Sequence, residues 1–417
     1  MQTKLHLNSN EGFILPVKEW NFSSKETLAS THALHPYVAS MNPHLACEVI
    51  KMINPEKGIV LDPFMGGGAV LVEALRLKTQ GQGIDVNPLA VLISKAKTTY
   101  VAKKDLSDAL RFILENYRKI DVEPLQFPKA YKIDFWFQPE CIGPLTKLIT
   151  LINQLDNEDV KNAYRAIFSV TVRDVSLTYR GEVRLRRLQG RDLERFKPNV
   201  LEKFSKRAEL AIDRISALPR EHIIQTSHGN VMDMTFEENQ FSSIVCSPPY
   251  GDDRNGVGYF QYSKNMLFWL GYSNDEIKNY KNNFLGEIKK DKTPPNSSAL
   301  VDVLDQMQHN KVASNPKAIQ ECIAFYHDYQ IALQEMTRVC SGKIAIVIGN
   351  RTLSKTKIDN AQITTELMKN LDYKLFKCLT RTIDKKRIGV MQPGGGARDT
   401  SGGGLINLEY TLIYEAK

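Results

Sequence analysis

The chain has 417 residues, of which 42% are hydrophobic and 24% charged, a balance typical of soluble globular proteins with core enough for two or three domains. No apolar stretch is long enough to span a membrane and the first residues contain no signal-peptide core, so we expect a cytoplasmic protein without a membrane partner. Its six cysteines are scattered without a C-x-x-C pair, which argues against a disulfide framework and a metal site, while the net charge of +8 favours a polyanionic partner.

An apolar run followed by glycines is the first informative segment. Residues 58–68 read G-I-V-L-D-P-F-M-G-G-G, and Ala69 to Leu77 follows with helical periodicity. This pattern predicts a buried strand, a tight glycine turn and a helix N-terminus, which together form the usual cradle of a nucleotide-like ligand. Glycine lets such a ligand approach the backbone where a Cβ atom would clash.

A second predicted strand, Gly81 to Ile84, ends in Asp85, about 20 residues after the glycine turn, where a carboxylate typically accepts hydrogen bonds from ribose hydroxyls. A dinucleotide site would require G-x-G-x-x-G, whereas three consecutive glycines follow Asp62 here. Asp62 would repel a pyrophosphate but attract the sulfonium and ammonium groups of S-adenosylmethionine. The alternative is a glycine-rich turn without a ligand.

A mainly helical insertion is predicted for residues 99–220, with helices near Asp105–Arg118, Pro144–Leu155 and Asn199–Leu218. From Arg173 to Arg207 it carries eleven positive residues against five negative ones. The part around Gly181 and Gly190 reads as an exposed ribbon or loop. Its arginines are candidates for phosphate contact and base reading, the alternative being a solvated basic face; they are Arg180, Arg184, Arg186, Arg187 and Arg191.

A third strand is predicted for His222–Thr226, and Asp233 in the loop after it could accept a hydrogen bond from an adenine amino group. The next strand, Phe241–Cys246, runs directly into Ser247-Pro248-Pro249-Tyr250. Paired prolines end a strand abruptly, so the carbonyl groups of this tetrapeptide have no ladder partner and must find donors elsewhere. A stiff row of acceptors beside an aromatic ring suits a planar base with an exocyclic amino group. The alternative is a turn with a tyrosine packed on its own domain.

The remaining segments continue an α/β pattern. Tyr259–Gly271 has apolar residues at helical spacing, so most of its aromatic side chains should be core. Residues 286–315 are polar and read as a mobile loop, and a glycine-rich flap is expected around Arg398. The other predicted elements are a helix at Pro316–Val339, a strand at Lys343–Ile348, a helix at Gln362–Asn370 and two terminal strands at Tyr373–Thr382 and Leu408–Tyr414.

These motifs together resemble those of the amino-methylating DNA methyltransferases, especially the N4-cytosine group. Residues 62–68 (D-P-F-M-G-G-G) are similar to the family's cofactor motif, with Gly68 as a loose match, and residues 83–88 (G-I-D-V-N-P) to its second motif. Ser247-Pro248-Pro249-Tyr250 is similar to its catalytic motif, in which serine is typical of cytosine-N4 enzymes and aspartate or asparagine of adenine-N6 enzymes. Residues 35–50 resemble the segment that closes over the methionine end of the cofactor, while the long insertion departs from the pattern.

The resemblance implies a Rossmann-like class I fold that binds S-adenosylmethionine, with a catalytic domain formed by residues 1–98 and 221–417 and a target-recognition region formed by residues 99–220. It implies base flipping in double-stranded DNA by a bacterial or archaeal, nucleoid-associated enzyme, in a restriction-modification or defence system with a possible partner endonuclease. An adenine-N6, RNA guanine-N2 or protein-glutamine methyltransferase is the alternative. Catalytic residues would be Ser247, Pro248, Pro249 and Tyr250; cofactor-binding residues would be Asp62, Pro63, Phe64, Gly66, Gly67, Gly68, Asp85, Asn87 and Asp233.

Overall fold

The computed structural model describes residues 14–16, 20, 26–179, 185–221, 223–251, 258–309, 315–382 and 408–417. The predicted flap around Arg398 therefore lies outside the described residues. No helix in these ranges is long and apolar enough to cross a membrane.

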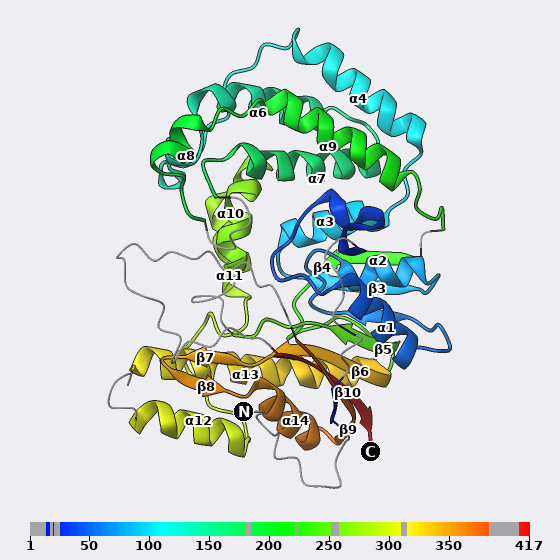
Figure 1. Ribbon diagram of the computed structural model, residues 1–417, viewed down its shortest axis with the longest axis vertical. Coiled ribbons are helices and arrows are strands. Elements are labelled where there is room, and N and C mark those ends of the chain that lie inside the picture. The colour runs from blue at the N-terminus through cyan, green and yellow to red at the C-terminus, as the bar shows by residue number, and fades with distance from the viewer. Residues whose placement is uncertain are drawn as a thin grey trace.

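An eight-stranded sheet forms the centre of the molecule (Figure 1). Across the sheet the strands are β1 (Ile14–Pro16), β9 (Tyr373–Thr382), β10 (Leu408–Ala416), β6 (Cys340–Gly349), β5 (Phe241–Cys246), β2 (Val60–Asp62), β3 (Gly81–Asp85) and β4 (Ile224–His228). β10 runs antiparallel to both neighbours, and the other adjacent pairs are parallel. The chain fills the sheet outward from β2 to β4 and then returns to β5, so the strand order reverses between β2 and β5. This is where open α/β sheets bind ligands.

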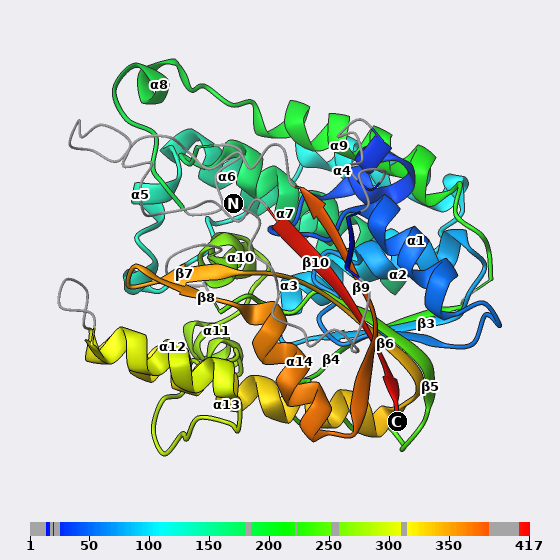
Figure 2. The same ribbon diagram turned by 60° about the horizontal axis from the view of Figure 1, so that its bottom comes forward.

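Helices cover both faces of the sheet. α1 (Pro43–Ile53) and α2 (Ala69–Arg76) pack on one face, while α12 (Ser298–His309), α13 (Pro316–Val339) and α14 (Asn360–Asn370) pack on the other (Figure 2). The sequence of β6 accounts for this, because Ala345 and Val347 point to the first face and Ile344, Ile346 and Ile348 to the second. A sheet buried on both faces confirms the predicted Rossmann-like class.

A separate helical layer lies at the top of Figure 1. It contains α4 (Lys103–Tyr117), α5 (Ile133–Trp136), α6 (Pro139–Asn153), α7 (Glu158–Val175), α8 (Gly190–Arg195) and α9 (Val200–Ile215), and it packs on α3 (Pro88–Thr98) of the sheet domain. Two later helices, α10 (Tyr259–Trp269) and α11 (Asn274–Asn282), share its core. Trp269 is fully buried there, as its helical spacing predicted.

Most predicted elements are present with ends shifted by a few residues. α6 begins at Pro139 and keeps Pro144 inside its first two turns, earlier than the predicted start at Pro144. The segment 286–315 is not a continuous loop, because α12 occupies part of it and buries Leu300, Val303 and Met307 at helical spacing. The described ranges also contain 3-10 turns at Glu26–Leu28, Ser30–Leu34 and Lys129–Tyr131 and the β7–β8 hairpin (Arg351–Leu353, Thr356–Ile358).

Candidate active site at the carboxyl edge of the sheet

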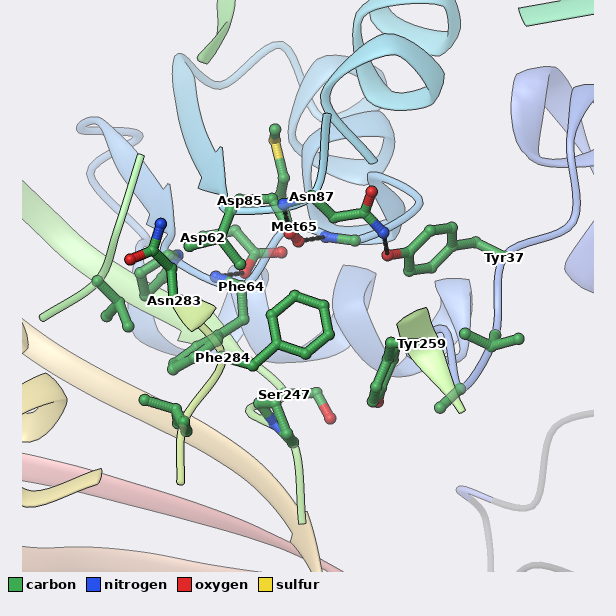
Figure 3. A pocket seen from close by; sticks show the side chains of 18 of the residues that line it. Tyr37, Asp62, Phe64, Met65, Asp85, Asn87, Ser247, Tyr259, Asn283 and Phe284 are labelled. Atoms are coloured by element: carbon green, nitrogen blue, oxygen red, sulfur yellow. Dashed lines mark hydrogen bonds between the residues drawn. The ribbon is translucent and has the colours of Figure 1, made fainter. Parts of the chain in front are cut away.

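One pocket lies where β2, β3 and β5 end, at the reversal of strand order (Figure 3). Its wall brings together segments that are distant in the sequence. The predicted site residues among those that line it are Asp62, Pro63, Phe64, Gly66, Gly67, Asp85, Asn87, Ser247 and Pro249.

Asp62 is the last residue of β2 and only 3% exposed. Its Oδ1 accepts a hydrogen bond from the backbone N–H of Phe64 at 3.1 Å. Burial, helped by the nearby charge of Asp85, raises the pKa of Asp62 to about 8. A carboxylate that is so costly to ionise in isolation is well suited to a cationic ligand.

Asp85 ends β3 and is held by two backbone donors. Its Oδ2 accepts from Gly66 N at 2.9 Å and its Oδ1 from Asn87 N at 2.8 Å. Burial raises the pKa of Asp85 to about 6 even though both donors lower it. The carboxylate therefore ties the glycine turn to the end of the second strand while it lines the pocket.

Gly66, Gly67 and Gly68 contribute to the site in different ways. A Cβ atom on Gly67 would lie 2.6 Å from Tyr37 Cβ, so only glycine allows the segment around Tyr37 to close on the turn. Gly66 and Gly67 line the pocket, but Gly68 does not. Gly68 has φ +77° and is the N-cap of α2, packed against Ser94, so its contribution is to the turn and the start of the helix.

The Ser-Pro-Pro-Tyr segment follows β5 as predicted. Ser247 and Pro249 line the pocket, whereas Pro248 is buried beside them and Tyr250 does not line it. The Tyr250 hydroxyl donates to Oε1 of Glu409 at 3.2 Å, and Asn360 Nδ2 donates to the Tyr250 carbonyl at 3.3 Å. Tyr250 is thus held by the end of the sheet.

One other expected ligand contact, that of Asp233, differs in the structure. Asp233 is exposed and does not line the pocket; Asn230 and Val231 line it instead. The reason is a tight local turn in which Asn230 pairs with Asp233 and Asn230 Oδ1 accepts from Met232 N at 3.0 Å. Asn87 does line the pocket, but its side chain also donates to Tyr37 Oη and to Ser263 Oγ, so it joins three segments.

Sequence reasoning missed one wall of the pocket. Asn283, Phe284, Leu285, Gly286 and Glu287, which follow α11, line it together with residues of α13. Figure 3 shows the Phe284 ring between the carboxylates of Asp62 and Asp85 on one side and Ser247 on the other.

The position of this wall is fixed by a buried contact. Asp328 of α13 accepts from Gly286 N at 2.9 Å and pairs with Lys292 at 2.7 Å. A Cβ atom on Gly286, which has φ +76°, would also meet the Phe325 backbone at 2.9 Å. The signal in the sequence was Phe284-Leu285-Gly286, two apolar residues followed by a glycine within a mostly polar run.

The described part of the basic stretch contains a short ribbon, in which Thr178 pairs antiparallel with Arg187. The Arg186 guanidinium lies 3.9 Å from the centre of the Tyr179 ring, and Arg187 Nε donates to the Phe135 carbonyl at 2.8 Å. Arg191 is exposed at the start of α8. Arg180 and Arg184 lie outside the described residues.

The chemistry of the pocket fits S-adenosylmethionine. The buried carboxylate of Asp62 and the partly buried carboxylate of Asp85 can receive cationic groups and hydroxyls, while the turn around Gly67 can receive a ligand close to the backbone. In the described part of the chain no cluster of His, Cys, Asp and Glu could hold a metal ion. Cys246 is buried inside β5 and burial raises its pKa well above the ordinary value, which makes it a core residue.

Comparisons with known proteins agree with this chemistry. A family model described as DNA methylase, for N6 and N4 methyltransferases, matches residues 7–96. The type II methyltransferase M.MvaI of Kocuria varians is 32% identical over 399 residues, which cover 88% of this chain and 87% of that protein. The type II methyltransferase M.MjaII of Methanocaldococcus jannaschii is 31% identical over 97 residues, 23% of this chain and 18% of that protein.

Among solved structures, the rRNA methyltransferase AviRa from Streptomyces viridochromogenes aligns over 94% of this chain and 93% of its own. The two chains are 12% identical and the TM-score is 0.30, so the structural similarity is weak. The similarity to M.MvaI extends along most of both proteins. With the sheet and the motifs described above, it shows that this chain belongs to the type II DNA methyltransferases of the amino-group (N6/N4) family.

Proposed function

We propose that this chain transfers a methyl group from S-adenosylmethionine to the exocyclic N4 amino group of a cytosine flipped out of double-stranded DNA. The observation that carries the proposal is that Ser247 lines the same pocket as Asp62 and Asp85. The Ser247 hydroxyl, an acceptor for an amino group, and two carboxylates suited to a cationic nucleoside therefore line one space. Serine as the first residue of the Ser-Pro-Pro-Tyr motif favours cytosine over adenine, by resemblance to the N4 group.

The residues of the pocket give each part of the cofactor a partner. The carboxylate of Asp62 would attract its positive charge and that of Asp85 its ribose hydroxyls, while Asn230 and Val231 replace Asp233 as the expected neighbours of its adenine. Gly66, Gly67 and the segment around Tyr37 would enclose the methionine end. When bound, S-adenosylmethionine supplies an electrophilic methyl group on a sulfonium centre.

The protein must make the cytosine amino group, which is a poor nucleophile, reactive enough to accept the methyl group. The lone pair of a cytosine amino group is delocalised into the ring. The Ser247 hydroxyl and the Pro248 carbonyl can accept hydrogen bonds from the two amino hydrogens, which favours a pyramidal nitrogen with its lone pair directed at the methyl group. These acceptors also stabilise the positive charge that develops on nitrogen, and the proton lost afterwards passes to water. Positioning and electrostatics are sufficient, so the site needs no strong general base.

Binding of DNA would use the helical layer. We propose that its basic ribbon contacts phosphates and that the layer, including α10 and α11, forms the target-recognition region. Flipping is required because the amino group of a paired cytosine cannot reach a pocket at the sheet edge. We further propose that the enzyme works in the cytoplasm of a bacterium or archaeon beside a partner endonuclease.

The test is methyl transfer from radiolabelled S-adenosylmethionine to DNA, RNA and protein, followed by mass spectrometry of the digested nucleosides. We expect N4-methylcytosine in DNA. N6-methyladenine as the only product would overturn the cytosine assignment, and transfer to protein or RNA alone would overturn the substrate class. Ser247→Ala should lower the rate about a hundredfold, by loss of one transition-state acceptor. Ser242→Ala, an exposed serine of the same strand, is the matched control.

A further inference from the structure

A buried lysine lies directly beneath the glycine turn. Lys97, in the last turn of α3, is only 4% exposed, and its Nζ donates to the carbonyl oxygen of Gly67 at 3.1 Å. None of the ion pairs found in the described ranges includes it. An ammonium group removed from water without a carboxylate is costly, so its presence here requires a reason.

Two donors on α3 hold the turn in place. Ser94, three residues before Lys97 and hence on the same face of the helix, donates from Oγ to the Gly66 carbonyl at 2.9 Å. The N–H of Gly66 donates to Asp85 and that of Gly68 to Met65 O at 2.7 Å. The N–H of Gly67 makes no hydrogen bond with another described residue and belongs to a pocket-lining residue. The backbone N–H of Gly67 is therefore the one amide of the glycine turn that can donate to a ligand in the pocket.

A neutral donor would satisfy the Gly67 carbonyl equally well, as Ser94 does for Gly66. The charge of Lys97 is therefore the feature to explain. Burial lowers the pKa of Lys97 to about 7, so the ammonium is held at the limit of its stability. An additional negative charge in the pocket would favour the charged form.

The surroundings of Lys97 do not supply that negative charge. Burial lowers the pKa values of His32 and His35, the latter to about 3, and the charge of Lys97 lowers both further. Glu73, the carboxylate that contacts His32, already accepts from His32 and Arg76. On the side of the helical layer the charges that act on His35 are those of Arg173 and Arg207, which are positive.

We propose that Lys97 is a positioning residue for the amino-acid end of the cofactor: its ammonium offsets the ligand carboxylate through the glycine turn, and ligand binding is coupled to proton uptake by Lys97. This rests on the proposed cofactor. The carboxylate is placed at the Gly67 amide, whose neighbouring peptide carbonyl is held by the lysine. Loss of the Lys97 charge weakens the binding of ligands that carry the carboxylate and leaves the binding of ligands without it unchanged.

The experiment is calorimetric titration of the full-length protein with S-adenosylhomocysteine and with 5′-methylthioadenosine, which lacks the amino-acid end. Each titration is repeated near pH 7.5 in buffers of different ionisation enthalpy, which reports the protons taken up. For Lys97→Met we expect about tenfold weaker binding of S-adenosylhomocysteine, from the loss of one screened charge interaction. Binding of 5′-methylthioadenosine should be unchanged and the proton uptake seen with the wild type should be reduced.

Two further variants separate the charge from the hydrogen bond. Lys97→Gln keeps a donor for the Gly67 carbonyl without the charge and should behave like Lys97→Met. Lys95 lies on the same helix, but its side chain is half exposed and its Nζ forms an ion pair with Asp159 Oδ1 at 3.8 Å. Lys95→Met should therefore bind both ligands like the wild type. Lys97→Gln should be at least as resistant to heat as the wild type at pH 7, because it removes a buried charge and keeps a donor for the Gly67 carbonyl. Lys97→Met leaves that carbonyl without a donor and should melt at a lower temperature than Lys97→Gln.

The possible failures are distinguishable. Equal losses for both ligands, a melting temperature of Lys97→Gln below that of the wild type, or proton uptake equal to that of the wild type would overturn the role of Lys97. If the wild type binds neither S-adenosylmethionine nor S-adenosylhomocysteine, the proposed cofactor fails and the inference fails with it. If the wild type binds both and the Lys97 variants bind equally well, the inference alone fails.

Discussion

The hydroxyl of Tyr250 donates to Oε1 of Glu409 at 3.2 Å, and Oε2 of the same glutamate accepts from Arg381 Nε at 2.6 Å. This pair joins the last residue of the Ser-Pro-Pro-Tyr segment to β10, 159 residues later in the chain. Glu409 is 8% exposed, so the contact is shielded from water. The antiparallel end of the sheet therefore fixes the direction of the tyrosine ring, and with it the far end of the row of acceptors.

A double-mutant cycle tests this linkage. Glu409→Ala leaves the Arg381 guanidinium and the Tyr250 hydroxyl without their shared acceptor, and Tyr250→Phe removes only the hydroxyl. We expect each to lower kcat about tenfold with little change in cofactor affinity, since a loosened ledge positions the amino group less well. The double variant should lose scarcely more than the single ones, because both break the same contact. Fully additive losses would show that the two residues act independently.

Asp62→Asn should make the folded protein more stable and weaken its binding of S-adenosylmethionine. The folded protein raises the pKa of this carboxyl from 3.8 to about 8, so the native state binds a proton more tightly than the unfolded state does. Its contribution to stability is therefore full below pH 3.8 and is lost as the pH rises toward 8. The amide is neutral, so the variant should melt at a higher temperature than the wild type at pH 8 but bind S-adenosylmethionine much more weakly.

Melting temperatures between pH 5 and pH 9 (about the range accessible to a folded protein) check the linkage. The difference between wild type and Asp62→Asn should grow as the pH rises. The exposed Asp121→Asn provides the matched control and should follow the wild type throughout. A parallel shift of both curves by a constant amount would contradict the assignment of a raised pKa to Asp62.

The role of Ser247, the first residue of the Ser-Pro-Pro-Tyr segment, in the choice of base can be tested by substitution. Ser247→Asn keeps a side-chain acceptor but moves it farther from the backbone, as in adenine-N6 relatives. We expect a lower rate on cytosine and a gain in the ratio of N6-methyladenine to N4-methylcytosine, measured by nucleoside mass spectrometry on the same DNA. Cofactor affinity should remain unchanged. A variant with a lower rate and an unaltered product ratio would show that base choice is made elsewhere in the pocket.

Features governed by local sequence could be predicted, and those set by distant contacts could not. The strand, the glycine turn and Asp85 follow from residues 58–85 alone, because strand ends and glycine conformations are local constraints. Asn230 rather than Asp233 lines the pocket because of the conformation of the turn between them, and the sequence does not specify that conformation. Phe284 reaches the pocket because Asp328 holds Gly286, a contact over 42 residues. No periodicity signals such a contact.

The arginines of the basic stretch differ in how far they are engaged with the rest of the protein. Arg186 and Arg187 both contact aromatic side chains, and Arg187 also bonds to the Phe135 carbonyl, so substitution of either can alter the ribbon itself. Arg191 is exposed at the start of α8 and is the cleaner choice. Arg191→Ala should weaken DNA binding and lower the slope of log K against log salt by about one if it contacts one phosphate.

The measurement is fluorescence anisotropy with a labelled duplex at several sodium chloride concentrations, and calorimetry for the cofactor, whose affinity should not change. Arg111→Ala, an exposed arginine of α4 paired with Asp108 at 2.6 Å, is the control for the loss of one surface charge. If both variants reduce affinity and slope equally, the ribbon contributes only through the net charge of the protein. A larger effect of Arg191→Ala than of Arg111→Ala assigns a phosphate contact to the start of α8, because counterion release depends on where the charge lies.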